Sequence, residues 1–264
     1  MTFGSTFGRV LSPTFQPSSQ AASSAAFVPT DISGCVLWLD FGDADYLFTD
    51  AGSTKVANDG DAIYQANDKS GNNNHATQSN SVYRPSYKTG AQNSLSAGYA
   101  AIKNKYYMNH HYPLGTATDF TVFLHAELTE LFNYAGFLGW RFLAGYTMNT
   151  TVDGALQVGT DMANRINVAA GLSANTNYLF VLKKSGSSSG NFSVKVNNGT
   201  PYVNTGKTAT SPNSRTMQLF ATGHAPGNDA MAGYIYEYIV YNSALSDTDR
   251  GTVETYLNNK WAIY

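Results

Sequence analysis

Cysteine and charge are both scarce in this chain of 264 residues. The single cysteine, Cys35, excludes an internal disulfide and a cysteine-based zinc site. Charged residues make up 13% of the chain, about half the usual share of roughly 25%. Sixteen Lys and Arg stand against 18 Asp and Glu, which leaves a net charge of −2. We therefore expect no nucleic-acid partner, because domains that follow phosphates gather Lys and Arg on one face.

Long apolar runs are absent as well. No stretch of about 18 apolar residues occurs, so we expect no membrane-spanning segment. Residues 1–9 (MTFGSTFGR) lack the charged start and apolar centre of a signal peptide, which predicts synthesis in a reducing cytoplasm. Nucleophile elbows, phosphate loops and dinucleotide fingerprints are also missing. We expect no cofactor.

Aromatic and small polar residues are abundant where charged residues are scarce. The chain holds 24 Gly and 18 Tyr, and hydrophobic residues make up 42% of it. This composition is typical of a turn-rich, all-β protein rather than of a helical bundle or a disordered chain. Alternating or apolar runs predict strands at residues 35–40, 119–128, 177–184, 192–196, 201–203, 216–222 and 231–241. Between two of them, the Asn-Gly pair at 198–199 predicts a hairpin with a type I′ turn.

One helix is predicted, at the C-terminus. Ser246 is a suitable N-cap, and Asp249 three residues later is a capping-box-like partner. Helical spacing then gives an apolar stripe that should pack on the sandwich, made of Val253, Tyr256, Leu257 and Trp261. Many short strands and one helix favour an antiparallel two-sheet sandwich.

Residues 1–30 form a separate segment, ahead of a domain at 31–264. The segment has one charge, several prolines and a Ser/Ala/Gln stretch, so it should lie outside the core. It nevertheless carries phenylalanines, each of which would contribute about 1.5–3 kcal/mol if buried in a partner. We expect an extended anchoring arm; a disordered tail or an arm folded on its own domain is the alternative. The predicted anchors are Phe3, Phe7, Arg9, Phe15 and Phe27.

Two stretches carry a resemblance to a known family. The first comprises residues 37–40 (LWLD), 48–50 (FTD), 58–61 (NDGD), 68–78 (DKSGNNNHATQ) and 84–87 (RPSY). The second comprises residues 233–242 (GYIYEYIVYN), 244–247 (ALSD) and the helix that ends at Lys260-Trp261. Together they resemble the laminin-G-like, or concanavalin A-like, jelly-roll domains of tailed-phage virion proteins and bacterial surface proteins. The resemblance covers about residues 31–264.

The resemblance implies a jelly-roll sandwich but not a ligand. Ala66 stands where the family often has Trp, and residues 101–108 (AIKNKYYM) depart from its usual segment. Residues 7–17 (FGRVLSPTFQP) resemble the starts of tailed-phage structural proteins with similar β domains. This implies an arm docked on a virion and a jelly roll that faces outward.

The same fold also houses glycosidases, so the carboxylates need inspection. A retaining glycosidase needs two carboxyl groups about 5–5.5 Å apart. Such enzymes of this fold place them on one strand face as Glu-x-Asp-x-x-Glu, and none of the four Glu shows that spacing. Glu237 is the one candidate, on a predicted strand face with Ile235 and Ile239, where burial would raise its pKa. A buried structural glutamate is the favoured interpretation, and we expect no catalytic residue.

Metal sites are not expected either. The Asp-rich loops, with Asp40, Asp43, Asp45, Asp59, Asp61 and Asp68, could supply calcium ligands, yet they match no EF-hand spacing. Aspartates that accept hydrogen bonds within turns explain most of them. The five histidines show no helical pair of the kind that binds zinc.

Exposed aromatic residues in or near loops could stack on sugar rings. The candidates are Tyr106, Tyr107, Tyr112, Trp140 and Tyr146, and we assign no glycan site among them. Tyr234, Tyr236 and Tyr238 alternate along one predicted strand and should share a face that packs between sheets or protomers.

The main functional hypothesis is therefore a non-enzymatic virion protein, an appendage, fibre or capsid-decorating subunit. It would be made in the host cytoplasm and displayed on the virion surface. Its expected partners are other virion proteins, further copies of itself in a trimer, and a host glycan bound weakly. One alternative is a carbohydrate-binding module of a bacterial surface protein, and another is a glycosidase that uses Glu237.

Overall fold

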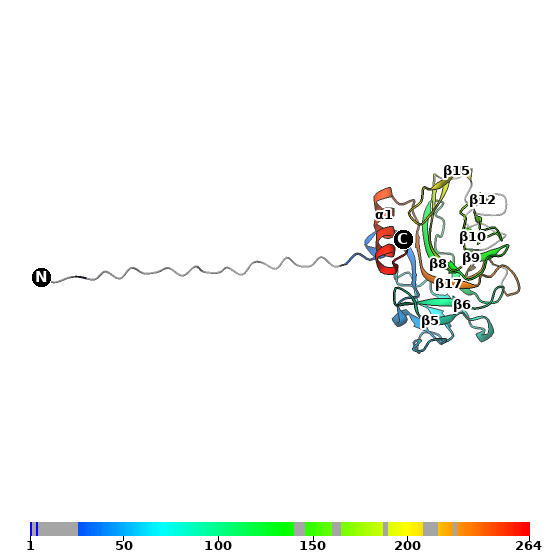
Figure 1. The fold of residues 1–264 in the computed structure, drawn as a ribbon, viewed down its shortest axis with the longest axis horizontal. Coiled ribbons are helices and arrows are strands. Elements are labelled where there is room, and N and C mark those ends of the chain that lie inside the picture. The colour runs from blue at the N-terminus through cyan, green and yellow to red at the C-terminus, as the bar shows by residue number, and fades with distance from the viewer. Residues whose placement is uncertain are drawn as a thin grey trace.

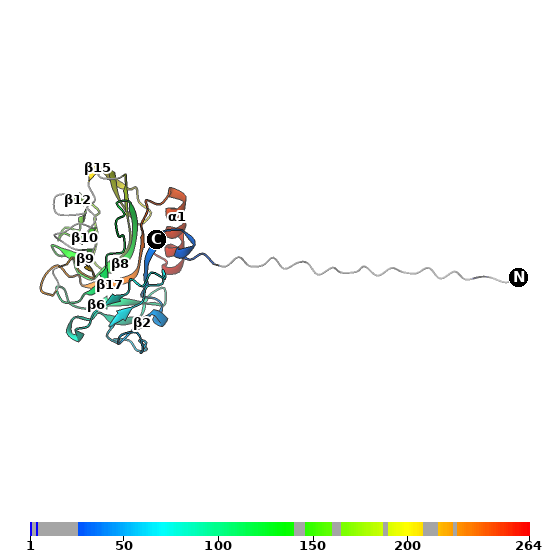
Figure 2. The same cartoon turned by 180° about the vertical axis from the view of Figure 1, so that it is seen from behind.

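The computed structural model describes residues 26–139, 146–159, 165–186, 190–207, 216–223 and 226–264, with Met1 and Gly4. Two antiparallel sheets pack face to face in this part of the chain, and one α-helix lies on the outside (Figures 1 and 2). The all-β sandwich with a short C-terminal helix is thereby confirmed. Among the described residues, no helix is both long enough and apolar enough to span a bilayer.

The eight-stranded sheet is built around β17. This strand pairs with β8 on one side and, on the other, with β6 through its first residues and β1 through its later ones. The order is β15 (Tyr202–Lys207), β14 (Gly190–Val196), β13 (Thr176–Ser185), β8 (Phe120–Leu128), β17 (Gly233–Tyr241), β6 (Leu95–Ala100) and β5 (Ser86–Gln92), with β1 (Cys35–Asp40) against β17.

The nine-stranded sheet faces it across the core. Its order is β12 (Arg165–Val168), β11 (Leu156–Gly159), β10 (Thr147–Thr150), β9 (Ala135–Gly139), β16 (Thr216–Leu219), β7 (Met108–His111), β4 (Ala76–Thr77), β3 (Gln65–Ala66) and β2 (Leu47–Phe48). Within the described ranges, three short 3₁₀ turns lie in the connections: η1 (Pro29–Asp31), η2 (Ala44–Tyr46) and η3 (Ser81–Tyr83).

The core between the sheets follows from strand alternation. On β8, the side chains of Phe120, Val122, Leu124 and Ala126 all enter this core, as the sequence pattern predicts. From the nine-stranded sheet they meet Met108, Leu138, Met148, Val158, Ile166 and Leu219. At about 25 cal/mol per Å² of apolar surface, this burial supplies most of the driving force for folding.

A second apolar layer lies under helix α1 (Asp247–Trp261). The cap forms as predicted, because Ser246 Oγ accepts a hydrogen bond from the Asp249 backbone nitrogen at 3.0 Å. Val253, Leu257 and Trp261 are buried against the outer face of the eight-stranded sheet, while Tyr256 is partly exposed. Figure 1 shows α1 on the side of β8 and β17, away from β9, β10 and β12.

The predicted hairpin exists, but its turn type is wrong. β14 and β15 pair across residues 197–201. Positive φ occurs at Asn197 (49°), and not at the Asn198-Gly199 pair that a type I′ turn requires. The side chain of Asn197 explains the difference, because its Oδ1 accepts a hydrogen bond from the Leu179 backbone at 2.7 Å and holds the loop against β13.

Candidate functional site

A β-bulge determines where Glu237 points. The pairing between β17 and β8 shifts register between Ile235 and Glu237. Ile235 and Tyr238 therefore enter the core between the sheets, whereas Tyr236 and Ile239 join the layer under α1. Two predictions are corrected here: Glu237 does not share a face with Ile235, and Tyr238 does not share one with Tyr236. An extra residue in one strand reverses the alternation that follows it.

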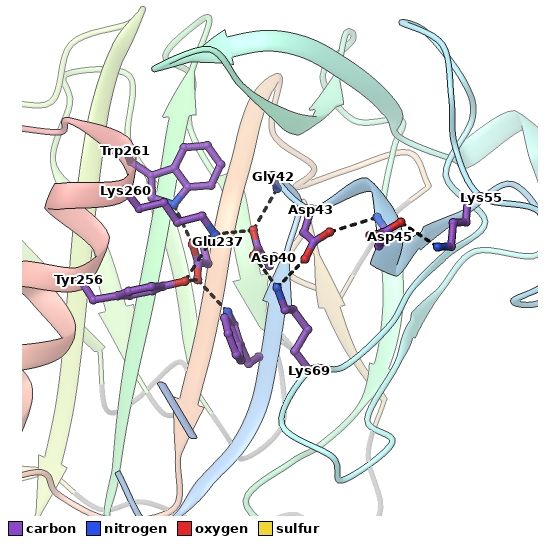
Figure 3. A network of polar contacts seen from close by, with 11 residues as sticks. Asp40, Gly42, Asp43, Asp45, Lys55, Lys69, Glu237, Tyr256, Lys260 and Trp261 are labelled. Atoms are coloured by element: carbon purple, nitrogen blue, oxygen red, sulfur yellow. Dashed lines mark hydrogen bonds and ion pairs between the residues drawn. The ribbon is translucent and has the colours of Figure 1, made fainter. Parts of the chain in front are cut away.

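Four hydrogen-bond donors occupy the Glu237 carboxylate (Figure 3). Oε1 accepts from the Trp38 indole at 2.7 Å and from the Tyr256 hydroxyl at 2.9 Å. Oε2 accepts from Lys260 Nζ at 2.8 Å and from the Trp261 indole at 2.7 Å. Glu237 as a whole is 1% exposed, and the donors come from β1 and from the last two turns of α1.

An alternating chain of charges continues from Glu237 toward the surface (Figure 3). Lys260 also contacts Asp40 Oδ1 at 2.7 Å, and Asp40 contacts Lys69 at 2.9 Å. Lys69 then reaches Asp43 at 2.8 Å, and its ammonium lies 4.5 Å from the Trp38 ring centroid. Each buried charge thus has a partner of opposite sign, which offsets much of its desolvation cost.

The pKa shifts follow from this arrangement. Burial raises the pKa of Glu237, and the Asp40 carboxylate raises it further, while Lys260 and Trp261 act in the opposite direction. Burial alone would lower the pKa of Lys69, but the charges of Asp40 and Asp43 raise it on balance. Hydrogen-bond donors occupy both oxygens of Glu237, and the carboxylate is buried. The geometry therefore gives this residue a structural role, in which it links β17 to α1.

The loop aspartates accept hydrogen bonds from backbone nitrogens, mostly in their own turns. Asp68 accepts from the backbone nitrogens of Trp38, Ser70 and Asn74 at 2.8–3.0 Å. Asp50 and Asp61 cap neighbouring turns in the same way. The described residues contain no group of three or more His, Cys, Asp or Glu that could hold a metal ion.

The five aromatic candidates for glycan contact differ in where the structure places them. Tyr112 is 3% exposed and Tyr146 is fully buried, so their prediction as loop-surface aromatics is wrong: both rings fill the core. Trp140 lies outside the described residues. Tyr106 packs on the core, whereas Tyr107 is partly exposed and does not.

Tyr107 belongs to a polar outer face of the nine-stranded sheet. Met108 enters the core, so the alternation of β7 places Tyr107 and Asn109 on the outer side. The ring of Tyr83 lies 5.8 Å from that of Tyr107, centroid to centroid, with an interplanar angle of 32°. Both rings are partly exposed.

Polar side chains extend this face over the neighbouring strands. Thr77 of β4 pairs with Asn109 of β7, and Gln65 of β3 pairs with Thr77, so the three stand side by side. We call the set Gln65, Thr77, Tyr83, Tyr107 and Asn109 the tyrosine–amide surface. All five of its residues are partly exposed.

Arg84 holds this surface in place. Its guanidinium donates to the backbone oxygens of Gln78 and Ser79, each at 2.9 Å, and lies 4.8 Å from the Tyr64 ring centroid. Gln78 in turn donates to the Tyr107 backbone oxygen at 3.1 Å. The surface is therefore a fixed platform of aromatic faces, amides and a hydroxyl.

Sequence reasoning named Tyr107 but missed Tyr83, Asn109, Thr77 and Gln65. The alternation of residues 106–111 (YYMNHH) was a usable signal, since it places Tyr107, Asn109 and His111 on one face. No local signal could have paired β3 and β4 with β7, because these strands are only two residues long.

The predicted anchors lie mostly outside the described residues: Phe3, Phe7, Arg9 and Phe15. Phe27 is described, and its ring meets Tyr256 of α1 edge-on at 5.9 Å. An anchoring role for these five residues stays a prediction.

Comparisons with known proteins show the fold alone. No family model and no curated protein matches the chain. The binding domain of Paraclostridial Mosquitocidal Protein 1 is similar over 88% of this chain and 53% of its own, with a TM-score of 0.59 and 13% identity. Domain 4 of an extracellular arabinanase from Geobacillus stearothermophilus, in complex with arabinotriose, is similar over 81% and 95%, with a TM-score of 0.56 and 12% identity.

A third similar structure is Trypanosoma rangeli sialidase in complex with sialic acid, with a TM-score of 0.54 and 15% identity. The match covers 87% of this chain but only 33% of the sialidase. The chain thus spans about a third of that enzyme and about half of the mosquitocidal binding domain. These likenesses agree with a jelly-roll-like β-sandwich; the laminin-G-like and virion assignments stay predictions.

Proposed function

We propose that this chain is a carbohydrate-binding module that binds an oligosaccharide without cleaving it. The observation that carries the proposal is the tyrosine–amide surface. Tyr83 and Tyr107 offer aromatic faces for the C–H side of a sugar ring, and the neighbouring Asn109, Thr77 and Gln65 offer donors and acceptors for its hydroxyls.

Similar structures support this proposal over the virion role. The arabinanase domain is described in complex with arabinotriose, and a botulinum neurotoxin type C structure of TM-score 0.55 is described as depending on two ganglioside molecules for cell entry. The pointer to a virion, residues 7–17, lies outside the described residues, and none of these structures is a virion protein.

The enclosure of Glu237 supports binding without hydrolysis. A glycosidase carboxyl group must reach the glycosidic oxygen or the anomeric carbon. Glu237 is 1% exposed, and four donors already occupy its two oxygens. We therefore place the function at the outer face of the nine-stranded sheet and not at this residue.

A glycan array that includes arabino-oligosaccharides and sialylated glycans, followed by calorimetry on the best ligand, tests the proposal. Tyr107→Ala and Asn109→Ala should each weaken binding about tenfold, which corresponds to about 1.4 kcal/mol. Tyr202→Ala is the matched control, because Tyr202 is a 44% exposed tyrosine on β15, in the other sheet. If both surface variants kept full affinity, the tyrosine–amide surface would not be the binding site. If the protein bound no glycan on the array, the proposed carbohydrate-binding function would be wrong.

A further inference from the structure

The Lys260 side chain contacts two buried carboxyl groups at once (Figure 3). Its Nζ lies 2.7 Å from Asp40 Oδ1 and 2.8 Å from Glu237 Oε2. Asp40 is the last residue of β1, Glu237 lies in the middle of β17, and Lys260 belongs to the last turn of α1. The side chains of Lys260 and Asp40 are 20% and 3% exposed. This site largely excludes water, which protects a bond formed there from hydrolysis.

The two oxygens of the Asp40 carboxyl group have different partners. Oδ1 faces Lys260 and also accepts a hydrogen bond from the Gly42 backbone nitrogen at 3.1 Å. Oδ2 is bound by the Lys69 ammonium at 2.9 Å. A cation at one oxygen stabilises the negative charge that develops there when a nucleophile attacks the carboxyl carbon. Lys69 thus prepares Asp40 for attack from the side of Lys260, with Oδ2 as the oxyanion.

Glu237 is positioned to move protons between Lys260 and Asp40. The Lys260 nitrogen becomes a nucleophile only when it loses a proton, and Glu237 Oε2 accepts from it at 2.8 Å. Burial and the Asp40 carboxylate raise the pKa of Glu237, which suits a group that must take up a proton and give it back. Three further donors, from β1 and α1, hold the Glu237 carboxyl group in this position.

We propose that Lys260 and Asp40 form an isopeptide bond within the folded chain. The Lys260 ammonium gives one proton to Glu237, and the free amine attacks Asp40 Cγ, so that the π electrons move to Oδ2 beside Lys69. A second proton then leaves the nitrogen. Both protons end on Oδ1, and the Cγ–Oδ1 bond breaks as water departs with its electron pair. One ammonium and one carboxylate become one amide and one water, and Glu237 and Lys69 are unchanged.

The bond gives the sandwich a covalent closure that a disulfide cannot supply in this chain, which has a single cysteine. It ties the first strand of the eight-stranded sheet to the C-terminal helix, so almost the whole domain lies inside the closed loop. A crosslink around a long loop limits the unfolded chain and thereby stabilises the folded one. This inference does not depend on the proposed glycan function.

The intact mass of the denatured full chain tests the bond. We expect the parent chain to be lighter than its sequence mass by one water molecule, and peptide mapping to find one branched peptide that joins residues 40 and 260. Lys260→Arg is the matched control, because the guanidinium keeps the charge but stays protonated and forms no amide. It should have its full sequence mass. A parent chain of full sequence mass would overturn the proposal, as would a loss of water that persists in Lys260→Arg.

Two variants test the residues that assist the reaction. Glu237→Gln removes the proton carrier, and Lys69→Gln removes the cation at Oδ2 while it changes a side chain closer to the surface. Mass spectra taken at intervals after cell-free synthesis follow bond formation, which each variant should slow by about 100-fold or more. Glu130→Gln, at an exposed site, should react like the parent chain. Parent-like rates in both variants would show that the geometry around Asp40 and Lys260 does not drive the reaction.

Discussion

The indole nitrogen of Trp261 donates a hydrogen bond to Glu237 Oε2 across 2.7 Å. This contact joins the last residue of α1 to the central strand β17. With Tyr256 and Lys260, it gives the helix three polar attachments to one carboxylate. The C-terminal helix is therefore held by a buried carboxyl group as well as by its apolar stripe.

Replacement of Glu237 by Gln should destabilise the fold strongly. The neutral amide keeps the shape but loses the charge that compensates Lys260, and its NH₂ group faces donors that need an acceptor. Breaking a buried pair on one side typically costs about 3–5 kcal/mol. Urea unfolding measures the loss. Glu130→Gln, which changes an exposed partner of Lys103, should stay within about 0.5 kcal/mol. Equal midpoints for the two variants would disprove the role given to Glu237.

Gly42→Ala should weaken the packing of α1 on the sandwich. A Cβ at Gly42 would lie 2.7 Å from Trp261 Cη2, in a fully packed layer. Overpacking of this kind costs about 1–3 kcal/mol. Gly251→Ala is the contrasting substitution, since an added Cβ there meets open space in the second turn of α1 and should stabilise the fold by up to about 1 kcal/mol. Thermal unfolding should shift the two variants in opposite directions; a shift of the same sign would contradict this packing.

Stability should fall as the pH decreases from about 6.5 to about 4. Burial lowers the pKa of His110 to about 4, from a value near 6.5 in the unfolded chain. A group with a lowered folded pKa stabilises above its unfolded pKa, and this contribution is lost as the pH falls toward the folded value. His125 has the same sign, because burial and Lys260 lower its pKa.

The variant His110→Gln separates the contribution of His110 to the pH dependence of stability from the contribution of the carboxyl groups. The raised pKa of Glu237 acts with the opposite sign, since it adds stability at low pH that is lost as the pH rises. The variant should therefore show a flatter dependence of unfolding free energy between pH 6.5 and 4 than the parent chain. A parallel curve would show that His110 is not neutral in the folded state.

The N-cap of α1 gives a smaller, local prediction. Ser246→Ala removes the oxygen that accepts from the Asp249 backbone and should cost about 1 kcal/mol. Ser246→Asp should retain most of the cap. Circular dichroism during urea unfolding reports both, and an unchanged midpoint for the alanine variant would contradict the importance of the cap.

Much of this fold could be predicted from local patterns. The strand of residues 35–40 and the alternation of β8 were predicted correctly, because side chains on a strand alternate whatever it pairs with. The capped helix followed for a similar reason, since Ser246 and Asp249 act within one turn. The candidate surface was predicted only at Tyr107. Its neighbours Thr77 and Gln65 arrive from strands of two residues, which have too little length to show a period.

The sequence by itself determined the all-β class, the capped C-terminal helix and the faces of the long strands, because those properties depend on residues within a few positions of one another. Tertiary structure decided the direction of Glu237 and the makeup of the tyrosine–amide surface. The bulge between Ile235 and Glu237 is a feature of the pairing of β17 with β8, a strand more than one hundred positions away in the sequence. One extra residue in β17 at this point reverses the alternation that the sequence predicts. The Glu237 carboxylate therefore faces α1 and binds three of its side chains.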